Sequence, residues 1–291
     1  MIVNIEAKTL LSRVSGIDTF FGLDYGMNLY RGCQHRCIYC DSRSRCYGID
    51  GFDRDVLVKA NAIDVLEQEL RKKRKKGIIG TGSMNDPYMP LERRIELTRR
   101  ALACIADYGF GVHVITKSDL VVRDLDLLRR ISRVSAAVSF TLTTVDDALA
   151  CIVEPGAPPP SARLHAMGQL SASGIETRVA LMPVLPFIED DWESVAAVVS
   201  AAHRHGARIV VPWFGLTMRD RQRGHFYRCL DVSFPGLRRR YERAFGENYA
   251  CPSPRADLLY ARTRALCESL GMDMEVKPLL APSAERLKLF E

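Results

Sequence analysis

Residues 28–40 read NLYRGCQHRCIYC, which places Cys33, Cys37 and Cys40 in the spacing C-x3-C-x2-C. They follow a short apolar run that is typical of a strand, so we expect the loop that carries them at the mouth of a sheet. Three thiolates this close together bind a soft or borderline metal centre. Four would be needed to close a structural zinc site or to ligate every iron of a [4Fe–4S] cluster. Three cysteines leave one iron open.

An open iron has a chemistry of its own. It can chelate the amino and carboxylate groups of S-adenosylmethionine (SAM), and an electron from the cluster then cleaves the sulfonium and releases a 5'-deoxyadenosyl radical. The spacing also leaves open a zinc site completed by His35, Cys46 or a more distant ligand. Three core cysteines are disfavoured because the loop is rich in Arg, His and Gln. The sequence therefore favours the open cluster.

Short apolar and β-branched runs alternate with helical patterns along the chain. The runs cover residues 27–30, 77–81, 111–116, 136–142, 176–181 and 208–211, and helical patterns begin near residues 61, 91, 124, 161 and 192. This alternation predicts an α/β fold with a parallel sheet whose chemistry lies at the C-terminal ends of the strands. Periodicity does not decide whether the sheet closes as a partial barrel or stays open. After about residue 215 the pattern predicts helices, with breaks at 235–236 and 251–254 and a last helix near 256–270.

The sequence resembles the radical SAM superfamily, because C-x3-C-x2-C with an aromatic residue before the last cysteine is that superfamily's signature. The stretches GTGSMNDPYMPLE, VITKSDLVVRDLDLL, VEPGAPPPSARL and LMPVLPFIEDD further resemble its spore photoproduct lyase-like branch. The resemblance implies a partial (β/α)6 barrel with a C-terminal helical extension. The expected organisation is an N-terminal extension over 1–25, a core domain over 26–215 and a helical extension over 216–291.

The resemblance also implies roles for individual residues. Cys33, Cys37 and Cys40 hold the cluster, and the SAM contacts are Tyr39, Asn85, Asp86, Lys117, Ser139, Met182 and Pro183. In this interpretation Tyr39 contacts the adenine, and Asn85 or Asp86 accepts a hydrogen bond from the methionine ammonium. Lys117 lies near the methionine carboxylate, Ser139 contacts the ribose or the carboxylate, and Met182 and Pro183 pack on the adenine. All of them are expected at strand ends.

Some of these residues also have ordinary structural interpretations. Lys117 could form an ion pair with Asp119 or Asp124, and Ser139 could be a strand hydroxyl without a ligand. Glu154 and Arg163 flank the proline-rich turn and are expected to pair with each other. Of the remaining cysteines, Cys104 is expected in the core, and a second cluster from the tail cysteines is a minor alternative.

The match to spore photoproduct lyase itself fails at two positions. The family's hydrogen-atom donor is a cysteine just before the turn after the second strand, where this chain has Ser83, and Asp41 replaces the tyrosine after the last cluster ligand. An O–H bond is far stronger than an S–H bond, so Ser83 cannot take over as donor. We therefore expect a radical SAM enzyme that abstracts hydrogen from a different, unidentified substrate. A lyase reaction is one candidate, and no catalytic residue is assigned.

The expected substrate class and electron donor follow from the same resemblance. The family analogy and the basic run at 71–76 favour nucleic acid or a nucleotide as substrate, with a peptide or a small metabolite as the alternative. An external electron donor such as flavodoxin or ferredoxin is expected. The competing class is a non-enzymatic zinc- or Fe–S-binding protein that binds nucleic acid.

The composition sets further bounds. The chain has 291 residues, 47% of them hydrophobic, and a net charge of +6, and none of its apolar runs reaches the ~18 residues that cross a bilayer. The N-terminus lacks the pattern of a signal peptide, so we expect a cytoplasmic protein whose nine cysteines are metal ligands, reactive thiols or core residues. The basic run RKKRKK at 71–76 supplies six positive charges, either as a solvated helix end or as a phosphate-binding patch. Whether the arginines near 219–223 and 238–240 face a substrate is open.

Overall fold

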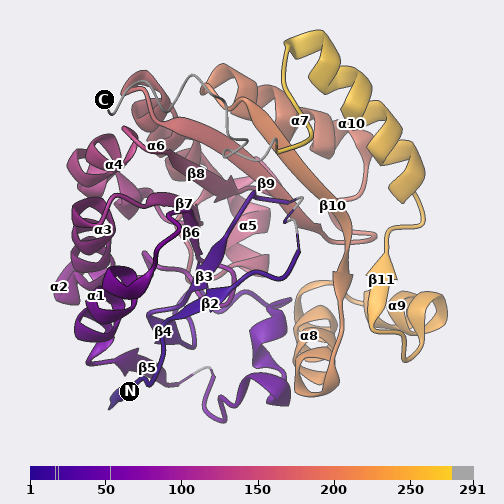
Figure 1. The fold of residues 1–291 in the computed structure, drawn as a ribbon. Helices are drawn as coiled ribbons and strands as arrows, with labels where there is room; N and C mark the ends of the chain where they lie inside the picture. Colours follow the sequence, from indigo (N-terminus) through magenta and orange to yellow (C-terminus); the bar gives the residue numbers. More distant parts are fainter. Residues whose placement is uncertain (17, 19, 53, 277–291) are drawn as a thin grey trace.

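The computed structural model describes residues 1–276 except 17, 19 and 53 (Figure 1). Among these residues the main sheet has eight strands in the order β11-β10-β9-β8-β7-β6-β3-β2, and its six central strands are parallel. The central strands are β3 (Tyr25–Met27), β6 (Ile78–Thr81), β7 (Gly111–Thr116), β8 (Ala136–Thr141), β9 (Glu176–Val184) and β10 (Ile209–Thr217). The two edges do not pair with each other, so the sheet is an open, partial barrel. The predicted fold class is confirmed.

The first predicted strand is wrong in its extent. Instead of one strand over residues 27–30, β3 ends at Met27 and a separate strand β4 (Tyr30–Arg31) joins a second sheet of order β1-β5-β4. That sheet also contains β1 (Ile2–Ile5) and β5 (Val56–Lys59). The chain therefore leaves the main sheet just before the cysteines and is held there by a second set of strand pairs.

Both edges of the main sheet carry a short antiparallel strand that the sequence did not reveal. β2 (Leu11–Arg13) pairs with β3, and β11 (Ala250–Pro252) pairs with the end of β10. The predicted break at 251–254 is thus a strand in part, and β10 extends beyond residue 215.

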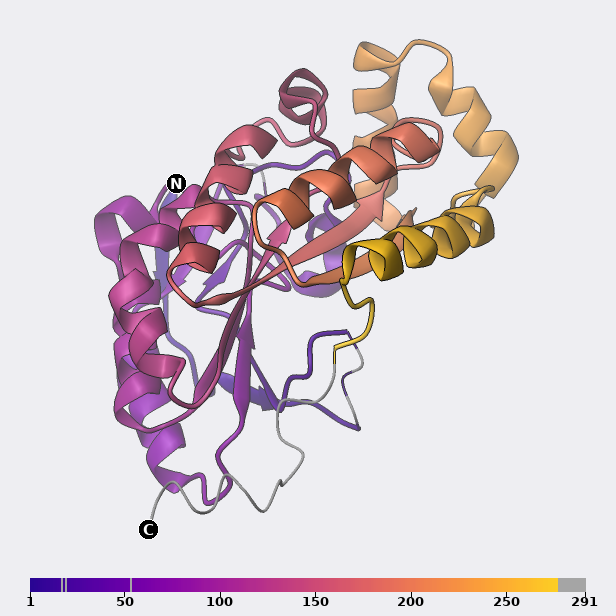
Figure 2. The same ribbon diagram turned by 90° about the horizontal axis from the view of Figure 1, so that it is seen from above.

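The helices connect the strands and cover the outer side of the sheet (Figures 1 and 2). The connecting helices are α1 (Ala62–Lys72), α2 (Glu92–Ile95), α3 (Leu97–Asp107), α4 (Leu125–Ile131), α5 (Asp147–Val153), α6 (Pro160–Ala172) and α7 (Trp192–Arg204). Short 3-10 turns are η1 (Asp41–Arg43), η2 (Arg45–Tyr47) and η3 (Asp119–Asp124). The single helix expected from residue 91 is two helices, because Glu96 adopts a left-handed conformation with φ 48° between α2 and α3.

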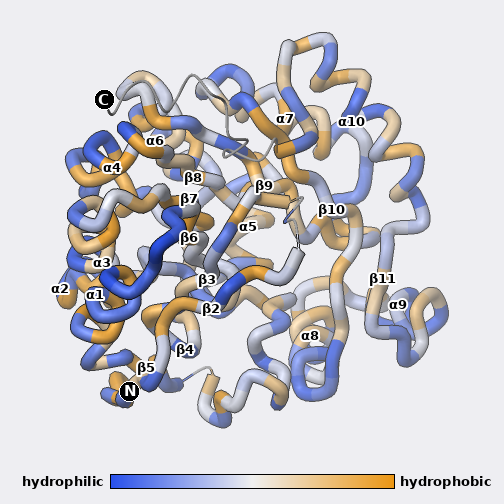
Figure 3. Tube along the Cα trace, in the orientation of Figure 1, coloured by the Kyte–Doolittle hydropathy of each residue, from blue (hydrophilic) through white to orange (hydrophobic). Residues whose placement is uncertain are grey.

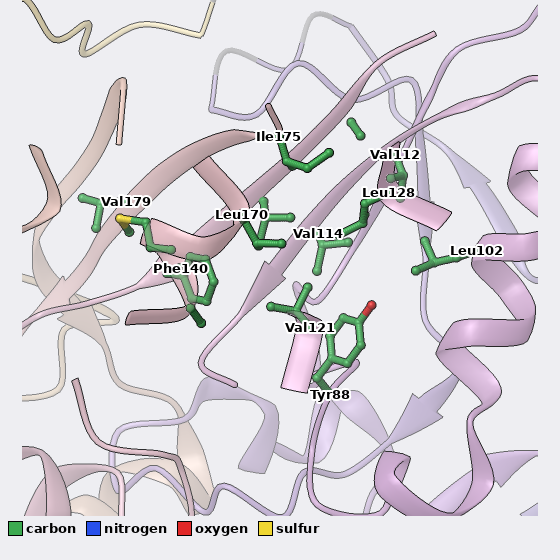
Figure 4. Packing of buried hydrophobic residues seen from close by; sticks show 14 of the residues in the cluster. Tyr88, Leu102, Val112, Val114, Val121, Leu128, Phe140, Leu170, Ile175 and Val179 are labelled. Atoms are coloured by element: carbon green, nitrogen blue, oxygen red, sulfur yellow. The ribbon is translucent and has the colours of Figure 1, made fainter. Parts of the chain in front are cut away.

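The main core lies between the sheet and these helices (Figure 4). Alternate residues of each strand face the helices, for example Val112 and Val114 of β7 and Phe140 of β8, and they meet Leu102 of α3 and Leu170 of α6. Figure 3 shows the corresponding apolar stretches along strands and helices. Because side chains alternate along a strand, the residues in between face the inner side of the curved sheet.

The C-terminal part contains α8 (Asp220–Ser233), α9 (Leu237–Phe245) and α10 (Ala256–Leu270). α10 packs on α7 and β10, whereas a second core joins α8 and α9 to the cysteine loop through residues such as Phe226, Tyr241, Ile38 and Tyr39. Of the proposed extension over 216–291, the part after residue 276 lies outside the described residues. Among the described helices, none combines the length and the apolar character required to span a membrane.

Candidate functional site

A cavity opens at the C-terminal ends of β6, β7 and β8. It encloses about 480 Å³ of space free of protein atoms, part of it open to solvent. Cys33, Cys37 and Cys40 line it, together with residues 82–86 after β6, residues 115–117 at the end of β7, and Thr141 at the end of β8. The spacing of the cysteines and the polarity of the parallel strands thus bring together the two parts of the site that the sequence predicts.

The segment after α5 fixes the shape of the cysteine loop. The backbone N–H of Ile38 donates to the Val153 carbonyl at 2.9 Å, and the N–H of Gly156 donates to the His35 carbonyl at 2.8 Å. A Cβ at position 156 would collide with the Gln34 carbonyl, so this close approach requires glycine. The VEPG stretch therefore acts as a backbone support for the three cysteines.

A buried network of charges lies beneath the loop. Glu154 accepts a hydrogen bond from the Tyr39 hydroxyl, forms an ion pair with Arg163 at 2.5 Å and lies 3.8 Å from Lys117 Nζ. Glu154 and Arg163 are 2% and 1% exposed. Burial alone would raise the pKa of Glu154, but the charges of Arg163 and Lys117 outweigh it and hold that pKa below its ordinary value. Glu154 is therefore an ionised carboxylate that fixes the position of Tyr39.

The three thiols of the cysteine loop are buried. Burial raises the pKa of Cys33 to about 12 and also raises those of Cys37 and Cys40. Buried thiols need a strong cationic centre to ionise, which iron supplies on binding. In a cluster each cysteine ligates its own iron, and the three cysteines that line this cavity would do so.

The other cysteines leave the set at three. Cys46, a candidate fourth ligand, is exposed on η2, with its sulfur 3.9 Å from Arg219 Nη1. His35, the other candidate, lines the cavity as well and is buried with its Nδ1 3.3 Å from Asp86. Cys104 is buried in the main core, as expected. Within the described part of the chain, the residues that line the cavity include no fourth cysteine. The donor set thus fits a cluster with one open iron.

The Asp86 carboxylate is hydrogen-bonded by neighbouring residues of the protein. Its carboxylate accepts hydrogen bonds from the Thr116 hydroxyl at 2.7 Å, the Lys117 N–H at 2.6 Å and the Tyr88 N–H at 2.8 Å. Burial opposes ionisation, but the neighbouring His35 charge and these donors lower the pKa of Asp86 to about 2. Asp86 ties the turn after β6 to the end of β7. Its neighbour Asn85 donates from its side chain to the Tyr30 carbonyl at 2.8 Å and so binds the same turn to β4.

The remaining predicted contacts lie at different depths. Lys117 lines the cavity, and its ion-pair partner is Glu154 rather than Asp119 or Asp124. Ser139 differs from the expectation of a strand-end position, because it lies in the middle of β8, fully buried, with its Oγ 2.8 Å from His113 Nε2. Met182 and Pro183 lie near the end of β9, half-buried, outside the set of residues that line the cavity.

Two residues of the site were missed by the sequence reasoning. Thr141 lines the cavity and lies two residues beyond Ser139, on the same side of β8, so the strand period could have found it. Gln222 of α8 donates to the Tyr39 carbonyl at 3.0 Å across 183 residues of sequence. No local pattern signals that contact.

Two relatives are similar in sequence to this chain over most of its length. An uncharacterized protein of Mycobacterium tuberculosis (strain H37Rv) is 32% identical over 261 residues, which cover 87% of this chain and 76% of that protein. An uncharacterized protein of Methanocaldococcus jannaschii is 34% identical over 191 residues, which cover 65% of this chain and 70% of that protein.

Solved structures share the fold. Spore photoproduct lyase complexed with dinucleoside spore photoproduct superposes with a TM-score of 0.71 at 16% identity, covering 94% of this chain and 81% of that chain. The radical SAM methyltransferase TsrM from Kitasatospora setae gives a TM-score of 0.55 at 15% identity, covering 89% and 54%. The expected likeness to spore photoproduct lyase is confirmed for the fold. The family model of the radical SAM superfamily matches residues 27–199, and the chain belongs to that superfamily.

Proposed function

We propose that this protein binds a [4Fe–4S] cluster through Cys33, Cys37 and Cys40 and uses SAM to abstract a hydrogen atom from a substrate other than spore photoproduct. The observation that carries the proposal is the common cavity, in which the three cysteines face the ends of β6, β7 and β8. The cluster would supply the electron that cleaves SAM to a 5'-deoxyadenosyl radical. An external donor such as flavodoxin or ferredoxin would deliver that electron.

The chain's own residues would bind and orient the cofactor. Lys117 lies in the cavity with its ammonium 5.7 Å from the centre of the Tyr39 ring, so a carboxylate can reach it beside an aromatic surface. The Asn85 side chain and the backbone of the turn after β6 offer acceptors for an ammonium. Ser139, Met182 and Pro183 remain proposed contacts that SAM would reach only by extending along the inner side of β8 and β9.

Nucleic acid or a nucleotide is the substrate class that we favour. The support is the likeness to spore photoproduct lyase, solved with bound AdoMet and dinucleoside spore photoproduct. The reaction would differ, because Ser83 occupies the donor position at the cavity and Asp41 is engaged with Arg219 and Tyr47. Incubation with dinucleoside spore photoproduct should not convert it back to two thymines above the level of a cluster-free control.

The test is anaerobic reconstitution with iron and sulfide, followed by reduction in the presence of SAM. We expect a [4Fe–4S] EPR signal that SAM alters and slow formation of 5'-deoxyadenosine without substrate. Cys33→Ala, Cys37→Ala and Cys40→Ala should each lose most cluster iron, whereas the matched control Cys46→Ala should retain it. Equal loss from Cys46→Ala would mean that the ligands are misassigned, and a colourless zinc protein would exclude the proposal.

A further inference from the structure

A second pocket begins one residue away from the cysteine cavity. Ser42 of η1 lines the cysteine cavity, and the next residue, Arg43, lines a pocket between residues 49–52 and helix α8. This pocket contains about 710 Å³ of space free of protein atoms, part of it open to solvent. The η1 turn therefore contributes to the walls of both pockets.

The walls of this pocket carry an excess of positive charge. Four arginines line it, Arg43, Arg54, Arg221 and Arg228, together with His225 and one carboxylate, Asp50. Arg54 pairs with Asp55 at 3.0 Å, so two carboxylates offset part of the charge of the four arginines. Asp50 pairs with Arg221 at 3.1 Å, but its side chain is fully exposed, so the pair is worth little and can open. The excess of arginine over carboxylate creates a positive potential inside a concave surface, which concentrates anions.

Helix α8 supplies three of these groups from one face. Arg221, His225 and Arg228 follow the spacing i, i+4, i+7, which brings side chains to the same side of a helix. Gln222, the neighbour of Arg221, fixes α8 to the Tyr39 carbonyl. The basic face is thus held in register with the cysteine loop.

The opposite wall holds its arginine rigidly. The Arg43 guanidinium lies 4.7 Å from the centre of the Phe52 ring, and both side chains are buried, at 5% and 6% exposure. The Arg43 side chain lines the pocket together with three further arginines. Arginine forms two parallel hydrogen bonds to phosphate oxygens, which lysine cannot do.

We propose that this pocket binds a phosphate ester group of the substrate and so holds the substrate beside the cysteine cavity. The inference rests on the proposed function and narrows its substrate class to molecules that carry a phosphate. A mononucleotide and a nucleic acid strand share this chemistry, and the experiment below separates them.

The experiment measures binding to anaerobically reconstituted, cluster-loaded protein. The probe is a short fluorescent single-stranded oligodeoxynucleotide, and thymidine 5'-monophosphate and thymidine are the competitors. The double variant Arg221→Gln/Arg228→Gln is compared with the matched control Arg94→Gln/Arg100→Gln, whose arginines are exposed on α2 and α3. Iron content confirms that each variant holds its cluster, and the single variant Arg228→Gln, at an exposed position, guards against misfolding.

We expect the pocket variant to bind the oligonucleotide about tenfold more weakly than wild type and the control variant to bind like wild type. The slope of log affinity against log salt should fall by roughly 1.4 for two lost contacts to a single strand. Competition by the monophosphate but not by thymidine also supports the pocket. A monophosphate as effective as the oligonucleotide identifies a small phosphate ester, and a much tighter oligonucleotide identifies a strand.

Equal binding by wild type, pocket variant and control variant would overturn the inference, as would wild-type protein that binds none of the probes. Formation of 5'-deoxyadenosine by the same wild-type preparation tests the proposed function separately. If 5'-deoxyadenosine forms but the pocket variant binds the probes like wild type, only the phosphate site is rejected. If the pocket variant binds more weakly than wild type but no 5'-deoxyadenosine forms, only the proposed function is rejected.

Discussion

At the scale of single residues, Glu154 shows how burial changes the value of an ion pair. Its pair with Arg163 and the surface pair of Arg130 with Asp107 have the same N–O distance of 2.5 Å. The first pair is 1% and 2% exposed, and the second is 49% and 57% exposed. The N–O distance therefore does not distinguish the two pairs, whereas burial and the further partners of Glu154 and Arg163 do.

We predict that Arg163→Ala lowers the free energy of unfolding by about 3–5 kcal/mol, because it leaves the Glu154 carboxylate buried without its main partner. It also removes hydrogen bonds to the carbonyls of Pro158 and Thr141. Arg130→Ala should cost less than about 1 kcal/mol. Denaturant unfolding of both variants beside wild type measures the difference, and similar losses would show that the buried network does not support the site.

A second buried carboxyl, Glu189, predicts a dependence of stability on pH. Burial raises the pKa of Glu189 from 4.5 to about 8, although the Leu185 N–H and the Thr143 hydroxyl donate to it. Between these two pH values the folded protein keeps a proton that the unfolded chain releases. Stability therefore falls as pH rises through this window, by at most about 1.4 kcal/mol per pH unit.

Glu189→Gln removes this titration, so its stability relative to wild type should rise steadily from about pH 5 to pH 8. Glu193→Gln, at an exposed position on α7, is the matched control and should keep a constant difference. Anaerobic denaturant unfolding at several pH values provides the measurement. A constant difference for Glu189→Gln as well would mean that Glu189 is ionised in the folded protein.

At the scale of elements, five of the six central strands were predictable because each is largely buried and rich in apolar or β-branched residues, whereas β3 overlaps its predicted range only at Met27. The short strands were not. β1 and β2 are mostly exposed, and they exist because β5 and β3 offer partners, which is a property of the fold rather than of the local sequence. The same holds in the site. The cysteine spacing is a local motif and could be recognised in the sequence, whereas the hydrogen bond from Gln222 to Tyr39 depends on how α8 packs.

We predict that this bond stabilises the cysteine loop. Gln222 is fully buried, and its side chain also accepts from the Arg219 N–H at 3.0 Å. Gln222→Ala leaves the buried Tyr39 carbonyl without a donor, at a cost of about 1–3 kcal/mol. The cluster should be lost faster to an iron chelator than in wild type. Gln68→Ala, at an exposed position on α1, should leave the rate unchanged, and equal rates for both variants would count against a role for α8.

At the scale of the whole molecule, the direction of the parallel strands separates two basic regions. The run at 71–76 begins in the last two residues of α1 and precedes β6, so it lies at the N-terminal end of the strands, opposite the cysteine cavity. Figure 3 shows it as a hydrophilic connection between α1 and β6. Two of its lysines lie over core aromatics, Lys73 over Tyr25 and Lys76 over Phe110. The arginines around α8 lie at the end where the cysteines are.

This separation yields a prediction about nucleic-acid binding. Replacing the exposed Lys72, Arg74 and Lys75 with Gln removes three charges without touching the two lysine–aromatic contacts. If the run held phosphates of a single strand, the salt slope would fall by roughly 2, which is more than the loss of two pocket arginines should cause. We expect instead an unchanged slope, because exposed charges farther away than the ~8 Å screening length contribute little at physiological salt. Cluster content and 5'-deoxyadenosine formation should also match wild type. A reduced slope would place the strand on the opposite end of the sheet and would separate substrate binding from the cysteine cavity.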